Sequence, residues 1–167
     1  MIQMKVFFHG AENHTNGEVL VQGDKLPEFN VENKDGQLVT SQDLLSDLTL
    51  ISVVPDLATS VCSLSTKKFN QEMDNYAGVK FYTISTNTVS QQKAWCAAEG
   101  VDKMELLSDL NHSFGMAMNL YISELNVDAR SVWVVNKAGE IIYREVLSEQ
   151  SHEPNYQAVL EFLQKQG

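Results

Sequence analysis

Short apolar runs alternate with stretches of helical periodicity along the middle of the chain. Residues 48–54 are β-branched and nearly all apolar, as expected of a central strand buried on both faces. Pro55 ends this run, because proline cannot donate to a ladder of strand hydrogen bonds. From Cys62 to Tyr76, apolar or small residues recur at intervals of three and four, which predicts one face of an amphipathic helix. This alternation indicates a layered α/β domain.

The second half of the chain continues the alternation. Residues 79–85 predict the next strand, and Thr88 or Ser90 is placed to cap a helix that ends before Gly100. Four more elements are expected: a strand at 104–108, a short helix near 112–118, a hairpin of 131–135 with 141–146, and a last helix opened by Pro154.

Two hairpins are predicted before this core. In the first 22 residues, strand-like runs at 4–8 and 18–21 flank a polar, turn-rich stretch. In the second, runs at 29–32 and 37–39 flank a turn containing Asp-Gly, and residues 40–45 suggest a brief helical turn. We therefore expect an α/β, thioredoxin-like fold, with a mixed central sheet of four or five strands flanked by helices and an N-terminal β-hairpin.

Composition narrows the class of protein. The 167 residues suit a single thioredoxin-like domain over 1–167, with residues 1–22 as its hairpin extension. The formal net charge of −10 disfavours nucleic acid and anionic membranes as partners. Neither a secretory signal nor an apolar run of membrane-spanning length is visible. We expect a cytoplasmic protein.

The chain has two cysteines, Cys62 and Cys96, which in a reducing compartment could simply be buried thiols. Cys62, however, falls in the first turn of a predicted helix, where free backbone N–H groups and the helix dipole favour a thiolate. Thr59 lies three residues earlier, as an N-cap would, and its hydroxyl could also bond to the sulfur or to a peroxide oxygen. Pro55 could help to shield a pocket around the Cys62 sulfur.

A thiolate that attacks a peroxide needs fixed donors and a permanent cation nearby, because negative charge develops on the peroxide oxygens. Only two arginines are available, Arg130 and Arg144. Arg130 enters a predicted strand, whose end could hold the guanidinium over the Cys62 helix, whereas Arg144 suits a surface position. The plain alternative for Arg130 is a surface ion pair with Asp128 or Glu124.

At this point a family resemblance is clear. Pro-x-x-x-Thr-x-x-Cys at 55–62 resembles the peroxiredoxin active-site motif, and a second cysteine follows 34 positions later in Cys-x-x-Glu-Gly. The likeness to thiol peroxidases, the atypical two-cysteine branch, runs over nearly the whole chain. It includes Lys68-Phe69-Asn70, Trp95–Gly100, Ala129-Arg130 and Glu153-Pro154-Asn155-Tyr156.

The resemblance implies roles for these residues. Cys62 would be the peroxidatic cysteine, Cys96 the resolving cysteine of the same subunit, and Thr59 and Arg130 the activating pair. It also implies a homodimer that reduces hydrogen peroxide and alkyl hydroperoxides in antioxidant defence, is recycled by thioredoxin, and uses no metal, haem or flavin. This branch usually has an acid and a glycine beside the threonine, where this chain has Ala58 and Ser60.

Cys96 lies late in a helix separate from that of Cys62. Because a disulfide needs Cα atoms roughly 4.4–6.8 Å apart, we expect both helices to unwind partly when the bond closes. Three other functions stay open: a non-catalytic peroxide sensor, a thiol–disulfide reductase (which the missing CxxC disfavours), and a structural domain. The four histidines are scattered and predict no metal site.

Overall fold

The structure is a computed structural model that describes residues 3–101 and 103–166. Its strands, in chain order, are β1 (Lys5–Phe8), β2 (Ala11–His14), β3 (Asn30–Glu32), β4 (Leu38–Thr40), β5 (Leu48–Val53), β6 (Val79–Ser85), β7 (Glu105–Ser108), β8 (Tyr121–Ile122), β9 (Val127–Asp128), β10 (Ser131–Val135) and β11 (Ile141–Val146). Its α-helices are α1 (Ser60–Glu72), α2 (Val89–Glu99), α3 (Ser113–Met118) and α4 (Tyr156–Gln166). Short 3-10 turns occupy Ser41–Leu44 (η1) and Met73–Asn75 (η2).

Seven strands form the central sheet, in the order β11-β10-β5-β6-β7-β3-β4. The inner strands β5, β6 and β7 run parallel, and the outer strands pair antiparallel, so the sheet is mixed as expected. It is wider than the four or five strands predicted, because the β3–β4 hairpin joins β7 through the pair Glu32 and Ser108. That single pairing has no local signal in the sequence.

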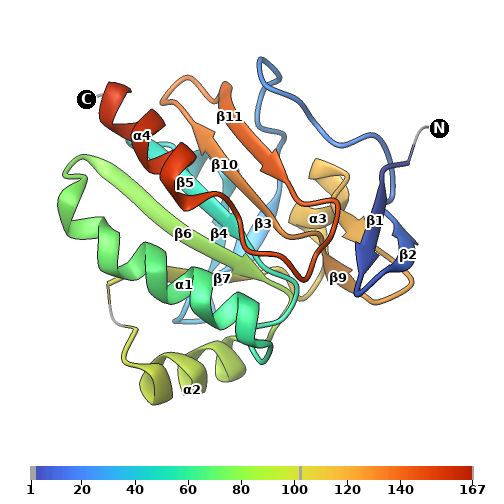
Figure 1. Ribbon diagram of the computed structural model, residues 1–167. Coiled ribbons are helices and arrows are strands. Elements are labelled where there is room, and N and C mark those ends of the chain that lie inside the picture. The colour runs from blue at the N-terminus through green and yellow to red at the C-terminus, as the bar shows by residue number, and fades with distance from the viewer. Residues whose placement is uncertain (1–2, 102, 167) are drawn as a thin grey trace.

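The apolar core has two parts, one on each face of the sheet, and β5 contributes side chains to both. Leu50 belongs to the part packed under α1 and α4, whereas the next residue, Ile51, belongs to the part packed under α3. Successive side chains of a strand point to opposite faces, so a strand buried on both sides must be apolar throughout. Figure 1 shows α1 and α4 along the same face of the sheet, with α3 away from them.

The N-terminal hairpin is present, but its second strand is not the predicted one. The partner of β1 is β2, because His9 and Gly10 both adopt left-handed backbone angles and make a tight two-residue turn. Residues 18–21 form no strand. The stretch that follows them runs beside the β10–β11 turn, where Gly23 N–H donates to the Ile141 carbonyl at 2.8 Å and Leu26 N–H to the Gly139 carbonyl at 2.7 Å.

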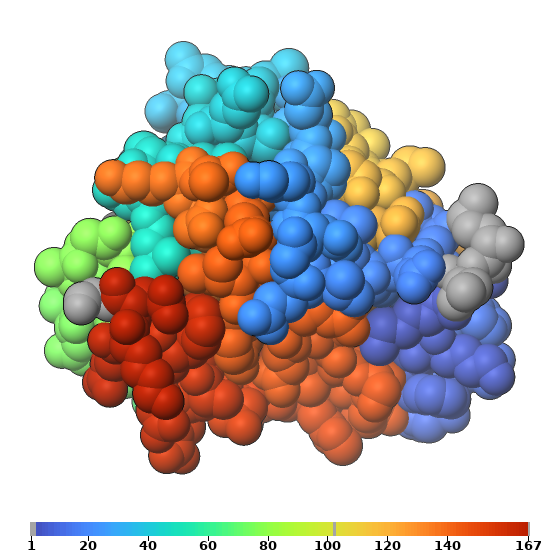
Figure 2. Space-filling model, turned by 90° about the horizontal axis from the view of Figure 1, so that it is seen from above, coloured from blue at the N-terminus to red at the C-terminus, as the bar shows by residue number. Residues whose placement is uncertain are grey.

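Figure 2 shows this N-terminal stretch, in blue, lying across the orange β10–β11 hairpin. The small β8–β9 hairpin was not anticipated from the sequence. Among the described residues, no helix is both long enough and apolar enough to cross a membrane.

Candidate active site

Cys62 lies in the first turn of α1, as the sequence predicted, and its side chain is fully buried. It belongs to the apolar cluster beneath α1 and α4, and its thiol is free. Two hydroxyl groups of the next turn bond to the Cys62 carbonyl: Thr66 donates to it at 2.9 Å and Ser65 at 3.2 Å. The sulfur is therefore held at the positive end of a helix and shielded from bulk water.

Thr59 occupies the N-cap position of α1 with an extended backbone, as predicted. Its hydroxyl does not cap the helix, however, since it donates instead to the Asp56 carbonyl at 2.9 Å, and that expectation was wrong. The Thr59 N–H also reaches the Asp56 carbonyl, at 3.1 Å, so the side chain closes a local turn before the helix begins.

The loop between β5 and α1 is fixed by a residue that sequence reasoning missed. The amide of Asn87 donates to an Asp56 carboxylate oxygen at 3.0 Å and accepts the Leu57 N–H at 3.0 Å. The Pro55 side chain is buried, and its carbonyl accepts the Thr86 hydroxyl at 3.3 Å. The segment after β6 therefore holds the loop that leads to Cys62.

Arg130 is 4% exposed, so the surface ion pair considered for it is wrong. Its Nε donates to the Gln150 carbonyl at 2.6 Å, and its backbone N–H donates to the Gln150 side chain. Its Nη1 is buried without a hydrogen-bond partner. A permanent cation with a free donor is thus held rigidly inside the protein, an arrangement that suits an anionic or developing negative charge.

Tyr156 connects Arg130 with α1. Its ring packs edge-on against Phe69 at 5.4 Å, and its hydroxyl donates to Glu153 at 2.9 Å. Burial and Glu153 raise the pKa of Tyr156, while a hydrogen bond with Ser65 and the charge of Arg130 oppose the rise. Ser65 lies one turn after Cys62, so Tyr156 is influenced both by the Cys62 end of α1 and by the charge of Arg130.

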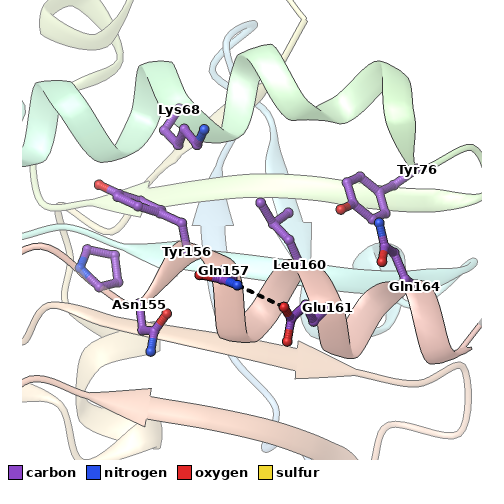
Figure 3. Close-up of a pocket in the computed structure, with 9 residues that line it drawn as sticks. Lys68, Tyr76, Asn155, Tyr156, Gln157, Leu160, Glu161 and Gln164 are labelled. Atoms are coloured by element: carbon purple, nitrogen blue, oxygen red, sulfur yellow. Dashed lines mark hydrogen bonds between the residues drawn. The ribbon is translucent and has the colours of Figure 1, made fainter.

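Figure 3 shows Tyr156 at the start of α4, between that helix and α1, at one side of an open hollow of about 670 Å³. Lys68 and Tyr76 line the hollow from the α1 side, and Gln157 with Glu161 line it from α4. A second hollow, of about 460 Å³, lies over the start of α1 and is lined by Thr59 and Trp95. Neither hollow is lined by Cys62 itself.

Cys96 is half-buried near the end of α2 and, like Cys62, is a free thiol. Burial raises the pKa of the Cys96 thiol above its ordinary value. Its carbonyl accepts the N–H groups of both Gly100 and Val101, which closes the helix. Both cysteines touch the apolar cluster beneath α1, on different helices.

Comparison with known proteins decides the family. The sequence pattern of the AhpC/TSA family matches residues 22–144. The chain belongs to the AhpC/TSA family. Among the relatives of this AhpC/TSA protein is a thiol peroxidase of Listeria monocytogenes serotype 4b (strain F2365), 49% identical over 144 residues, which are 86% of this chain and 87% of the relative. The thiol peroxidase of Bacillus subtilis (strain 168) is 37% identical over 158 residues, 94% and 95% of the two chains.

Solved structures agree with this family assignment. A peroxiredoxin-like protein from Aquifex aeolicus superimposes with a TM-score of 0.90 at 28% identity, covering 99% of both chains. A thiol peroxidase from Chromobacterium violaceum shares the fold, with a TM-score of 0.89 at 18% identity and 99% coverage of each chain. The expected thioredoxin-like peroxiredoxin fold is confirmed, and the chain is a peroxidase of the peroxiredoxin type.

Proposed function

We propose that Cys62 is the peroxidatic cysteine of this enzyme and that Arg130 and Thr59 bind the peroxide beside it. The observation that supports the proposal is a buried guanidinium whose Nη1 has no partner, together with the burial of Cys62 at the positive end of α1. Pro55, buried just after β5, would shield the sulfur from that side. The burial of Cys62 and Arg130 keeps water from both groups, which strengthens electrostatic contacts made to them.

The first step would consume one hydroperoxide. The Cys62 thiolate attacks the terminal peroxide oxygen, the O–O bond breaks, and the departing alkoxide or hydroxide takes a proton to leave as an alcohol or water. Sulfur is oxidised to a sulfenic acid as the peroxide is reduced. Arg130 would stabilise the departing oxygen, and the Thr59 hydroxyl would first have to turn away from Asp56 to donate to the substrate.

In the second step, the Cys96 thiol would condense with the sulfenic acid, giving an intramolecular disulfide and one water. This step requires movement, because the two cysteines lie on separate, intact helices. The local structure favours movement of α2, since Gln92 is the only fully buried residue of that helix. Burial raises the pKa of Cys96 in the folded helix, so the thiolate is disfavoured there.

A thioredoxin-type dithiol would then reduce the disulfide by thiol–disulfide exchange. The family resemblance supports this reductant, hydrogen peroxide and alkyl hydroperoxides as substrates, a homodimer, and a place in the cytoplasm. The disulfide chemistry needs no metal or organic cofactor, because the two thiols supply both electrons.

The test is NADPH-coupled peroxide reduction with thioredoxin and its reductase, run separately with hydrogen peroxide and with an alkyl hydroperoxide. We expect Cys62→Ser and Cys96→Ser both to lose turnover. In a single-turnover reaction without reductant, Cys96→Ser should still consume one equivalent of peroxide, whereas Cys62→Ser should consume none. Equal peroxide consumption by wild type and Cys62→Ser would refute the assignment of the nucleophile.

The same assay separates the other candidate functions. A peroxide sensor would be oxidised once, with little consumption of peroxide when reductant is supplied. A thiol–disulfide reductase would reduce insulin, which a peroxidase without a CxxC motif should not do.

A further inference from the structure

Three potential ligand side chains meet on the α3 side of the sheet, on the face opposite Cys62. They are Asp109, just after β7, His112, just before α3, and Asp128, at the end of β9. One ligand atom from each lies within 4.8 Å of the other two. Of the buried side-chain atoms that lack a hydrogen-bond partner in the part of the chain described here, three of the four belong to this cluster.

Asp128 is the least satisfied of the three. Its carboxylate is 0% exposed, and neither oxygen receives a hydrogen bond from a donor. Asp109, in contrast, accepts the N–H groups of Phe114 and Gly115, each at 2.8 Å. The polar group that faces Asp128 is the Asp109 carboxylate itself, and two carboxylates this close repel unless a proton or a metal cation lies between them.

Gly115 provides the space in which these carboxylates meet. A Cβ at this position would lie 1.9 Å from Asp128 Oδ1 and 3.2 Å from Asp109 Oδ2. Any larger side chain at position 115 would therefore occupy the space between the two carboxylates. The backbone of α3 approaches both carboxylates closely only because this side chain is absent.

His112 is held toward the same point. Its backbone is left-handed, with φ at 63°, and its ring stacks on Tyr121 with centroids 4.5 Å apart. Tyr121 is the register partner of Asp128 in the β8–β9 hairpin, so one small hairpin positions both side chains. The Nδ1 atom of His112 is buried and has no partner.

A shared proton would satisfy only part of this arrangement. It would join one oxygen of Asp109 to one of Asp128, and it would leave His112 Nδ1 and the second Asp128 oxygen without partners. A divalent cation would neutralise both carboxylates and accept the imidazole lone pair. We propose that Asp109, His112 and Asp128 form a site for one divalent first-row transition-metal ion, foremost Zn²⁺.

The ligand set and the distances fit such an ion. Two carboxylates with one imidazole suit zinc and its neighbours better than magnesium or calcium, which prefer oxygen alone. Ligands about 2.0–2.2 Å from one ion at a tetrahedral angle lie roughly 3.4 Å apart. Binding would therefore draw the three groups together, by about 1.4 Å at most, and leave a fourth position for water.

The test uses the full chain with both thiols removed, Cys62→Ser/Cys96→Ser, so that neither cysteine can hold the metal. After treatment with EDTA, thermal unfolding is measured with and without ZnCl₂. A site of this kind should raise Tm by roughly 5–10 °C at a hundred times its Kd. Titration with Co²⁺ should give visible d–d bands that saturate at one ion per chain.

Two variants in this host locate the ion, and a third controls for surface binding. Asp128→Asn keeps the shape but removes the charge, and His112→Ala removes the imidazole; both should abolish the Tm shift and the cobalt bands. His14→Ala removes a half-buried imidazole outside the cluster that contacts Glu12 at 3.0 Å and Glu124 at 3.4 Å, and it should change neither the Tm shift nor the cobalt bands.

Absence of any shift in the host overturns the proposal and leaves the shared proton as the link between the two acids. A shift that survives in Asp128→Asn and His112→Ala, or that disappears in His14→Ala, overturns it as well. If Asp128→Asn does not fold, His112→Ala and the cobalt spectrum of the host still decide. Because the host lacks both thiols, the result is independent of the proposed peroxidase cycle.

Discussion

Arg130 takes its position from one neighbour, Gln150. The Gln150 side chain accepts the Arg130 N–H, and its amide also donates to the Leu147 carbonyl at 2.6 Å and to the Arg130 carbonyl at 3.3 Å. Gln150 is fully buried, so water cannot replace these bonds at low cost. The side-chain amide of Gln150 thereby satisfies three backbone groups, while the main-chain carbonyl of Gln150 accepts the guanidinium Nε.

Gln150→Ala should therefore harm both stability and chemistry. Buried backbone groups left without partners cost about 1–3 kcal/mol each, so we expect a loss of about 2–4 kcal/mol in urea unfolding. The main-chain carbonyl that accepts the Arg130 Nε remains in this variant, but loss of the three side-chain bonds should let the Arg130 backbone shift. A guanidinium displaced by about 1 Å in this way should lower the rate of Cys62 oxidation by up to roughly 100-fold. Stopped-flow oxidation of the variant measures the second effect.

Gln157 provides the matched control, because it is exposed on α4 and bonds only to the exposed Glu161. Gln157→Ala should change stability by less than about 0.5 kcal/mol. If Gln150→Ala unfolds and reacts like Gln157→Ala, the positioning role assigned to Gln150 is wrong.

The sequence predicted the site residues whose position depends on neighbours in the chain, and it did not predict those whose partners are distant in the chain. Cys62 and Thr59 were placed correctly because a strand, a proline and a helix start identify their position locally. Asn87 and Gln150 reach the site from 20 to 31 residues away. No periodicity encodes such contacts, because they exist only after the sheet has assembled.

At the scale of elements, the N-terminal hairpin is tied to the rest of the protein by Glu149. Its carboxylate accepts the N–H groups of His9 and Gly10 at the β1–β2 turn, and also the N–H and hydroxyl of Ser151. These hydrogen bonds, chiefly those from Ser151, lower the pKa of Glu149 to about 2. The negative charge is thus part of the structure that holds the hairpin.

The stabilisation from Glu149 should depend on pH in a defined direction. Because its pKa is lowered on folding, the contribution is complete above pH 4.5 and is lost as the pH falls toward 2. Glu149→Gln should have a lower Tm than wild type at neutral pH, and the two should converge near pH 2. Parallel Tm profiles across this range would contradict the assignment.

Elements with a continuous apolar signal were predicted closely, and those defined by a turn were not. Strand β6 has the bounds predicted for it, because residues 79–85 are β-favouring and 81–85 are buried. The first hairpin failed at its second strand, since Ala11–His14 is polar and exposed and lacks any strand pattern. There the left-handed turn at His9 and Gly10 decides the pairing, and hydrophobicity does not.

At the scale of the whole molecule, the proposed disulfide requires part of the fold to open while the sheet stays intact. Residues 58–60, which lead into α1, are exposed, and α2 has little buried surface, so the start of α1 and α2 can unwind at low cost. Strands β5 and β6 are buried nearly throughout and paired along their lengths, so they should stay closed when the disulfide forms.

Hydrogen exchange can test whether the helix ends open while β5 and β6 stay intact. Compared with the reduced protein, the disulfide form should lose protection by at least roughly tenfold at residues 59–66 and 90–100, with no change in β5 and β6. Cys96→Ser treated with one equivalent of peroxide is the control, because it can be oxidised but cannot form the intramolecular bond. Equal protection in the reduced and disulfide forms would refute local unfolding.

The segment that lies against the β10–β11 turn has a consequence for self-association. Hydrogen bonds from Gly23 to Ile141, and from the Ile141 N–H to Asp24 at 2.9 Å, occupy backbone groups at the start of the outermost strand. At the opposite edge, β4 offers only three residues. A second copy of the chain would therefore find no free backbone at Ile141 and only a short strand at β4, so edge-to-edge growth of the sheet is disfavoured at both places.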